Sequence, residues 1–286
     1  MNMRNISLDK VLVTGADGMV GSYVDFGIRT NHRSLDITDL KETMAVVEKY
    51  RPDAILNLAA ETDVDRCERD PEYAYLVNGV GAYHVAYAAH KFGAKLIHVS
   101  TAGVFDGKKE SPYNEDDVPN PQNYYGHSKF LGELAIRGMA EDYIIVRACW
   151  MMGGGPKKDQ KFVAKIIAQL IKPETREINA VNDQVGAPTF GKDLIAAIKE
   201  LIEKDSRGIY HLANTGVVSR FDVAKKIAEL VRPGIKVNSV PSSFFNLDAK
   251  RTANEAMASR FDLMRPWDQA IEDYITSEWA DVLPHK

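Results

Sequence analysis

The chain has 286 residues, of which 45% are hydrophobic and 27% are charged, as in an ordinary globular protein. This length allows one large domain or two small ones. The formal net charge of -4 lacks the basic footprint of a nucleic-acid-binding protein, so we expect no nucleic acid partner.

The cysteines and the apolar runs indicate which kinds of site and segment the chain lacks. Cys67 and Cys149 lie far apart in the sequence and predict neither a disulfide framework nor a metal-ligand cluster, so no metal is expected. The N-terminal stretch MNMRNISLDK has no apolar core of the kind that a signal peptide needs. No apolar run approaches the ~20 residues that cross a bilayer. We therefore expect a cytoplasmic protein with no membrane partner.

Alternating strands and helices run through the chain. The predicted strands are 10–15, 51–60, 94–101, 142–150 and 208–214. The predicted helices are 38–50, 70–92, 124–140, 159–172, 190–204, 219–231, 252–260 and 266–279, with an edge strand between 232 and 251. This alternation predicts an α/β fold, a Rossmann-type doubly wound parallel sheet with a smaller C-terminal substrate-binding lobe.

The predicted division of the chain follows from the same pattern. Residues 1–150 are expected to form a Rossmann domain, to which later strands near 178–215 return, and the glycine loop described next predicts that this domain binds NAD(P). Residues 151–286 are expected to form mainly the substrate-binding lobe.

The stretch VLVTGADGMVGSYV carries Gly15, Gly18 and Gly21 between the first strand and a helix start. Such a turn lets the backbone approach a pyrophosphate at a helix N-terminus. The spacing G-x-x-G-x-x-G is one residue wider than the common dinucleotide fingerprint. The alternative is an ordinary tight turn.

A short second strand at 27–31 is expected, because LDITD at 35–39 follows Gly21 too soon for a full crossover helix. The end of this strand usually carries an acid when the cofactor is NAD. Here Asn31, His32 and Arg33 stand in its place, which favours NADP(H) over NAD(H). The alternative is that His32 and Arg33 are solvated loop residues.

The stretch NYYGHSKFLGE places Tyr125 and Lys129 at i and i+4, on one face of a predicted helix. A nearby ammonium favours the phenolate and would lower the pKa of the tyrosine, which could then serve as a general acid or base. The alternative is an amphipathic helix with an exposed lysine. His98 is expected to be packed within its strand, and Asn78 to have a structural role.

Eight motifs, in this order, resemble the extended short-chain dehydrogenase/reductase family, in its dTDP-4-dehydrorhamnose reductase branch. They are TGADGMVG, LDITD, LNLAAETDVDRCE, VSTAGVFDG, YYGHSKFLGE, VRACWMMG, DQVGAPT and RPWDQAIEDY. The resemblance implies Thr101, Tyr125 and Lys129 as the catalytic residues. Strand alternation lets only one of Ser100 and Thr101 face the site, and the position favours Thr101.

The same resemblance implies the binding residues. Those implied for the cofactor are Gly15, Asp17, Gly18, Met19, Val20, Asn31, His32, Arg33, Asp36, Ile37, Leu58, Ala59, Ala60, Tyr125 and Lys129. Those implied for the substrate are Thr62, Ala102, Trp150, Gln184 and Arg251. Trp150 would pack on the sugar, Arg251 would lie near the diphosphate, and Asp183 and Thr189 would flank Gln184 in a substrate-side loop.

Two departures from the branch's pattern put the choice of sugar in doubt. Ala102 and Gly103 stand where the branch usually has Asp-Tyr, and Thr252 stands where it often has proline. Either Glu61 or Thr62 could supply the lost contacts.

The predicted function is NAD(P)H-dependent reduction of the 4-keto group of a deoxy-sugar nucleotide, with a nucleotide sugar as the partner molecule. The alternatives are another nucleotide-sugar reductase or epimerase, or a non-catalytic NADP-binding regulatory subunit. A homodimer is an expectation from the family alone.

Overall fold

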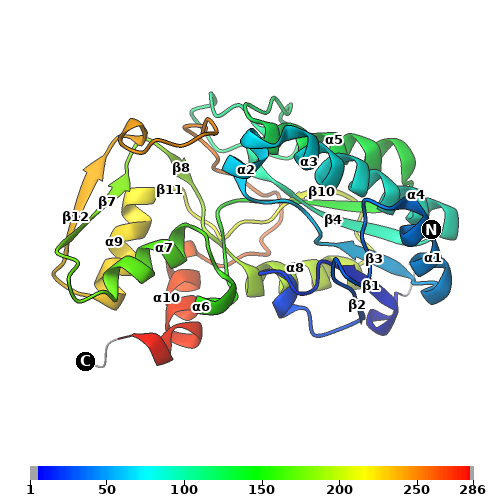
Figure 1. Ribbon diagram of the computed structural model, residues 1–286, viewed down its shortest axis with the longest axis horizontal. Coiled ribbons are helices and arrows are strands. Elements are labelled where there is room, and N and C mark those ends of the chain that lie inside the picture. Colours follow the sequence, from blue (N-terminus) through cyan, green and yellow to red (C-terminus); the bar gives the residue numbers. More distant parts are fainter. Residues whose placement is uncertain (1–5, 284–286) are drawn as a thin grey trace.

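A computed structural model describes residues 6–283, so the first five residues of the N-terminal stretch considered above lie outside it. Figure 1 shows a larger lobe built on a parallel sheet and a smaller lobe beside it. The sheet has six strands in the order β10-β5-β4-β3-β1-β2. Their bounds are β1 Val11–Thr14, β2 Ile28–Arg29, β3 Ala54–Asn57, β4 Lys95–Thr101, β5 Tyr143–Ala148 and β10 Gly208–His211. The strand order reverses between β1 and β3, which is where ligands bind in open α/β sheets.

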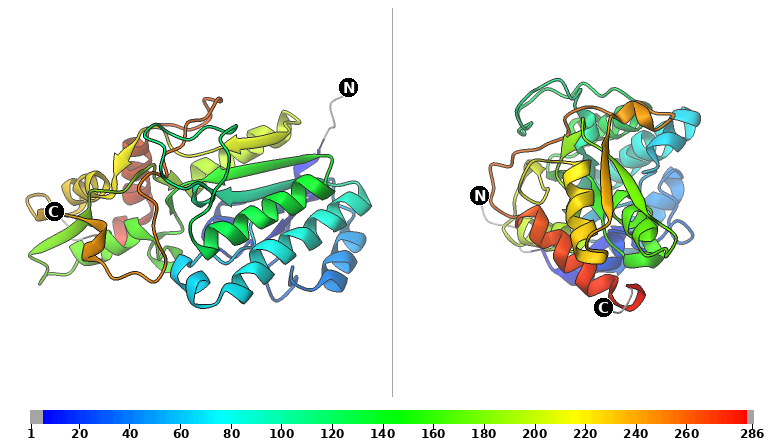
Figure 2. Two further views of the ribbon diagram at one scale, coloured as in Figure 1. Left: turned by 90° about the horizontal axis from the view of Figure 1, so that it is seen from above. Right: turned by 90° about the vertical axis from the view of Figure 1, so that its left-hand side faces the viewer.

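Helices cover both faces of this sheet, because successive side chains of a buried strand point to opposite sides. In β1, Leu12 packs with one cluster, which includes residues of α1 (Leu40–Tyr50), α4 (Ala82–Phe92) and α5 (Tyr124–Met139). Its neighbours Val11 and Val13 pack in the opposite cluster with α8 (Gly191–Glu203). The left view of Figure 2 shows the sheet between these two layers. The predicted α/β Rossmann-type fold is confirmed.

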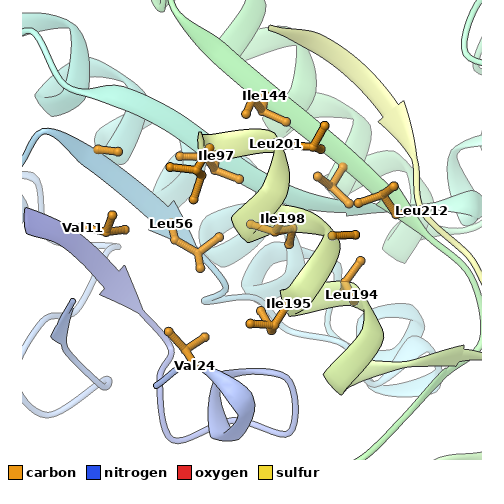
Figure 3. Packing of buried hydrophobic residues seen from close by; sticks show 14 of the residues in the cluster. Val11, Val24, Leu56, Ile97, Ile144, Leu194, Ile195, Ile198, Leu201 and Leu212 are labelled. Atoms are coloured by element: carbon orange, nitrogen blue, oxygen red, sulfur yellow. The ribbon is translucent and has the colours of Figure 1, made fainter. Parts of the chain in front are cut away.

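The first crossover after β1 is short, as expected. A single 3-10 turn, Gly21–Tyr23, precedes the two-residue strand β2. Helix α8, from much later in the chain, covers this face of the sheet. Figure 3 shows Leu194, Ile195 and Ile198 of α8 against the strands.

The segment predicted as one helix over 70–92 is divided. It consists of α3 (Pro71–Tyr75), a π-helical turn at Leu76–Gly81, and α4, and it is preceded by α2 (Val64–Arg69). The turn lies against α5, where a Cβ on Gly132 would come within 2.5 Å of the Asn78 carbonyl oxygen. Glycine therefore permits this close contact between helices.

The smaller lobe has its own apolar core, which includes Ile167, Ile227 and Ile271. Its helices are α6 Gly155–Lys158, α7 Phe162–Leu170, α9 Arg220–Val231 and α10 Trp267–Glu278. Its short strands are β6 Met151–Met152, β7 Glu177–Val181, β8 Val185–Gly186, β9 Thr189–Phe190, β11 Val218–Ser219 and β12 Lys236–Val240. Of the described strands between 178 and 215, β10 joins the main sheet, whereas β7 pairs with β12.

The helix predicted over 252–260 does not form, and this expectation is wrong. The segment is irregular and makes isolated bridges from Asn254 to Val185 and from Met257 to Tyr113. The amide of Val185 donates to the carbonyl of Ala253. These contacts with both lobes use backbone groups that a helix would need for itself, so tertiary structure overrides helix propensity.

No helix within residues 6–283 is long and apolar enough to span a membrane.

Candidate active site

The three predicted catalytic residues meet at the carboxyl end of β4. Thr101 is the last residue of β4, and Tyr125 and Lys129 lie in the first two turns of α5. The Thr101 side chain lies close enough to the Tyr125 phenol to lower its pKa. Lys129 Nζ donates to the carbonyl oxygen of Val99 at 2.7 Å. The side chain of Asn123 caps α5 by accepting from the Gly126 amide at 2.8 Å, which fixes where the helix begins.

Ser100 points away from this group, as strand alternation requires. Its hydroxyl donates to Glu133 at 2.5 Å. Glu133 also accepts two hydrogen bonds from Arg147 of β5, at 2.7 and 3.0 Å. This fully buried ion pair anchors α5 to the sheet one turn beyond Lys129.

Burial dominates the electrostatics of the site. Although the Tyr125 side chain keeps some exposure, desolvation raises its pKa to about 12, against the effect of the Thr101 side chain, which lowers it. Desolvation also lowers the pKa of Lys129 to about 8, while nearby Glu133 opposes that shift. The expected lowering of the Tyr125 pKa by Lys129 is therefore wrong for this structure, because desolvation raises that pKa and Lys129 is not among the main causes of its shift.

The glycine loop lies at the carboxyl end of β1, beside the residues that follow β3. Gly15 has φ +67°, and a Cβ there would come within 2.8 Å of the Ala59 nitrogen. Only glycine fits this position without strain. Gly18 is exposed at the tip of the loop. The loop, with the helical turn after it, therefore fits the pyrophosphate of a dinucleotide.

The residues after β2 form a tight turn. Asn31 Oδ1 accepts from the amides of Arg33 and Ser34, and Asn31 Nδ2 donates to Asp17 at 2.6 Å. His32 and Arg33 are exposed beside this turn.

The remaining residues implied for the cofactor have mixed surroundings. Met19 and Val20 lead into the turn at Gly21–Tyr23. Asp36 is exposed and accepts from Thr38 at 2.7 Å, whereas the side chain of Ile37 is buried in the core. The backbone of Leu58 and Ala59 binds Thr14, and Ala60 follows them, partly buried.

Trp150 follows β5 in an unusual backbone conformation, with φ +27°. Its Nε1 donates to Glu255 at 2.6 Å, and the Arg220 guanidinium lies 4.2 Å from the ring centroid. A Cβ on Gly186 would come within 2.6 Å of the indole. The ring is therefore held firmly, and Arg220 covers one of its faces.

The other residues implied for the substrate are spread more widely. Gln184 accepts from Arg220 Nε at 3.3 Å, so it belongs to the Trp150 group. Arg251 pairs with Asp65 of α2 at 2.9 Å. Thr62 accepts from Lys161 at 2.8 Å through its carbonyl oxygen.

Three further positions considered for the substrate differ in their surroundings. Ala102 is buried. Asp183 accepts from Ser242 at 2.9 Å. The buried hydroxyl of Thr189 has no hydrogen-bond partner within residues 6–283.

Sequence reasoning missed Arg220, Glu255 and Lys158. Lys158 Nζ donates to the Asp17 carbonyl oxygen at 3.0 Å, which links the smaller lobe to the glycine loop. Arg220 follows the helix cap Ser219, where a cation has no evident role. Glu255 lay inside the helix wrongly predicted over 252–260. In each case the signal is a contact between distant segments, which spacing along the chain does not reveal.

A cavity of about 420 Å³ lies elsewhere, beside β10, lined by residues such as His211, Met257 and Phe261. None of the implied catalytic residues lines this cavity. Within residues 6–283 no group of three or more His, Cys, Asp or Glu side chains is arranged to hold a metal ion.

Residues 9–278 match the family described as RmlD substrate binding domain. The chain belongs to this family. Among curated relatives, the spore coat polysaccharide biosynthesis protein SpsK of Bacillus subtilis (strain 168) is 34% identical over 282 residues, covering 94% of this chain and 97% of the relative. The dTDP-4-dehydrorhamnose reductase of Mycobacterium tuberculosis (strain H37Rv) is 36% identical over 266 residues, covering 88% and 86%.

Solved structures of family members have the same fold over nearly the whole chain. A dTDP-4-dehydrorhamnose reductase from Clostridium acetobutylicum has a TM-score of 0.88 at 32% identity, covering 93% of this chain and 98% of its own. The same enzyme from Bacillus anthracis, in complex with NADP, has a TM-score of 0.87 at 34% identity, with the same coverage. The predicted family and its extended short-chain dehydrogenase/reductase fold are confirmed.

Proposed function

We propose that this protein reduces the 4-keto group of a deoxy-sugar nucleotide with NAD(P)H. The observation that carries the proposal is the meeting of Thr101, Tyr125 and Lys129 at the carboxyl end of β4. The relatives named dTDP-4-dehydrorhamnose reductase, which align along most of the chain, support it.

The side chains divide the work of the reaction. A bound nicotinamide supplies the hydride, because amino-acid side chains cannot. Tyr125 donates its proton to the carbonyl oxygen as that oxygen gains charge. The Thr101 hydroxyl fixes the same oxygen by a hydrogen bond. The raised pKa of Tyr125 keeps the phenol protonated until an alkoxide, which is far more basic, accepts the proton.

For the cofactor, we propose a preference for NADPH over NADH. Exposed Arg33 and His32 beside the Asn31 turn support this preference. Gly15, Gly18 and the amides after β3 would hold the pyrophosphate, and Lys158 would close over it from the smaller lobe.

For the substrate, we propose a sugar choice that is broader than, or different from, that of the rhamnose-forming relatives. Ala102 is buried and Gly103 has no side chain, so neither supplies a polar group to the sugar. Glu61 is already bound to Arg66 at 2.8 Å and Thr62 to Lys161, which leaves them poorly placed as replacements. An open site discriminates weakly between hydroxyl patterns.

The test is NADPH oxidation with 4-keto-6-deoxy sugars linked to dTDP, GDP, UDP and CDP, using Tyr125→Phe as the inactive control. Turnover of at least one sugar that disappears in the control supports the reductase. No turnover with any of them would favour a regulatory role. Exclusive turnover of dTDP-4-dehydrorhamnose would contradict the proposed sugar choice but not the activity.

We also propose a homodimer through α4, α5 and the turn at 76–81. Leu76, Val80 and Tyr83 are exposed there beside Leu131 and Leu134 of α5. Two such helix pairs can bury this surface symmetrically. Light scattering of Leu134→Glu should give the monomer mass, with Val118→Glu, in the exposed loop before α5, as control. For location we propose the cytoplasm, the compartment that supplies nucleotide sugars and NADPH.

A further inference from the structure

Three neighbouring strands carry polar residues in one row. Thr14 of β1 lies in register with Asn57 of β3, and Asn57 lies in register with His98 of β4. Residues in register on parallel strands point to the same face of the sheet. All three are buried, with exposures of about 1%. Polar side chains in such a position need hydrogen-bond partners.

The row ends at the catalytic lysine. Thr14 Oγ1 and Asn57 Oδ1 are 2.6 Å apart, Asn57 Nδ2 and His98 Nδ1 are 3.0 Å apart, and His98 Nε2 and Lys129 Nζ are 3.4 Å apart. At the other end, Thr14 Oγ1 accepts from the Ala59 amide, beside the glycine loop. The row of contacts therefore connects the residues beside the glycine loop to Lys129.

The histidine cannot accept a hydrogen bond at both ring nitrogens. Burial keeps the pKa of His98 well below its usual value, so the ring is neutral and carries one N–H. When Lys129 is an ammonium it must donate to Nε2, so Nδ1 carries the proton and the Asn57 amide presents its oxygen. When Lys129 is a neutral amine it can accept from Nε2–H, and the Asn57 amide then presents its NH₂ group.

We infer that His98 is a positioning residue for Lys129. Whenever the lysine gains or loses its proton, the His98 ring changes its tautomer and the Asn57 side-chain amide reverses its orientation. This inference rests on the proposed reductase function, in which Lys129 supports Tyr125. It gives a role to a buried histidine that is not one of the three proposed catalytic residues.

The direction of the effect on Lys129 follows from hydrogen bonding to its charged form. An acceptor at Nε2 stabilises the ammonium, so removing the ring should lower the pKa of Lys129. The other titratable groups that act on the lysine are Glu133 on its own helix and Cys67 of α2, and Tyr125 lies one turn before it in α5. Glu133 is bound to Arg147, so it does not replace the histidine as a partner.

Two substitutions separate the two ends of the ring. His98→Gln places an amide near the position of Nε2, where it can serve Lys129 in either protonation state. His98→Asn places an amide near Nδ1, where it reaches Asn57 but not the lysine. We expect kcat to fall within about threefold for His98→Gln and by about tenfold or more for His98→Asn. The alkaline limb of the kcat profile should move down by about one pH unit in His98→Asn only.

A spectroscopic measurement on the unmodified protein does not depend on how the variants fold or on the identity of the substrate. In protein labelled with ¹⁵N-histidine, the His98 signals should change from the Nδ1–H to the Nε2–H tautomer as Lys129 titrates. Lys129→Met should abolish that change. A fixed tautomer between pH 6 and 10, or equal pH profiles for the two His98 variants, would overturn the inference. A tautomer change without keto-sugar reduction would leave it standing and refute the proposed function instead.

Discussion

The two sides of the site are held in different ways. On the side of the chemistry, Thr101, Tyr125 and Lys129 lie on β4 and α5, and buried contacts such as the Glu133–Arg147 pair fix them. On the proposed substrate side, Trp150 lies in the turn after β5, whereas Arg251 and Glu255 lie in one irregular segment after β12. Those segments are joined by single hydrogen bonds and partly exposed ion pairs.

This difference suggests a division between what is fixed and what can vary. Reacting groups need to be placed within a fraction of an ångström, which regular elements achieve better than loops. Substrate choice can change through one residue of a loop without disturbing the fold. The departures at Ala102 and Gly103 lie just beyond the end of β4, at the boundary between the regular elements and the loops.

The largest effect should come from the chemistry side. Tyr125→Phe removes the proton donor and keeps the ring, so kcat should fall by about 10²–10⁴ with the melting temperature unchanged. The matched control is Tyr124→Phe, since Tyr124 is the exposed neighbour on the same helix. Steady-state NADPH oxidation gives kcat for both variants. Similar turnover in the two variants would remove Tyr125 from the mechanism.

The buried ion pair should dominate stability. Arg147→Met leaves the charge of Glu133 buried and unpaired, so unfolding in urea should show a loss of about 3–5 kcal/mol. Lys236→Met, which breaks an exposed pair with Glu177, should lose about 1 kcal/mol or less. Adding Glu133→Leu to Arg147→Met should recover much of the loss. If the two single variants lose the same stability, the contrast between buried and exposed contacts fails.

The next prediction concerns Arg33, which follows the edge strand β2 of the larger lobe. Arg33→Ala should lower kcat/KM for NADPH by about tenfold or more, because a charge-assisted hydrogen bond to the 2'-phosphate is lost. The value for NADH should stay unchanged. Lys41→Ala, an exposed cation on α1, is the control. Equal losses with both cofactors, or no preference in the unmodified protein, would refute the assignment.

On the substrate side we expect an effect on binding more than on chemistry. Glu255→Gln weakens the anchor of Trp150, so KM for the nucleotide sugar should rise by about tenfold while kcat changes by less than about threefold. Exposed Glu174→Gln serves as control. A fall in kcat as large as that of Tyr125→Phe would place Glu255 with the chemistry and break the comparison.

The smallest effect should come from the pair between Asp65 and Arg251, which is partly exposed on both sides. Burial alone would raise the pKa of Asp65, but the Ala249 amide and Arg251 together hold it below the usual value. Such a carboxylate contributes stability above its unfolded pKa and loses it as pH falls through the folded one. Asp65→Asn should therefore cost at most about 1 kcal/mol at pH 5–8, and the difference from the unmodified protein should shrink below about pH 4. Calorimetry that finds a constant difference down to pH 3 would contradict this.

Much of the fold could be predicted from sequence because its signals are local. The apolar runs that became β1, β3, β4 and β5 and the periodicity of α5 and α8 depend on neighbouring residues only. The 252–260 segment failed because its Ala, Glu and Met residues favour a helix, whereas its backbone pairs with Val185 and Tyr113.

The site could be predicted only in part, for the same reason. Thr101, Tyr125 and Lys129 belong to motifs that are continuous in the chain. The row of contacts behind Lys129 belongs to no such motif. The contact of His98 with Asn57 depends on the register of β3 against β4. Arg220 and Glu255 approach Trp150 from segments that are distant from it and from each other. Register and lobe contacts are properties of the folded chain rather than of any short stretch.

The short first crossover has a consequence for synthesis of the protein in the cell. Because α8 covers the sheet face beside Gly21–Tyr23, that face lacks its cover after β5 has been made and until residue 203 has left the ribosome. At about 5–20 residues per second the interval lasts about 3–11 s. The nascent larger lobe thus presents a bare apolar surface to the cell for seconds, and folding of that lobe is completed only after much of the smaller one has been translated.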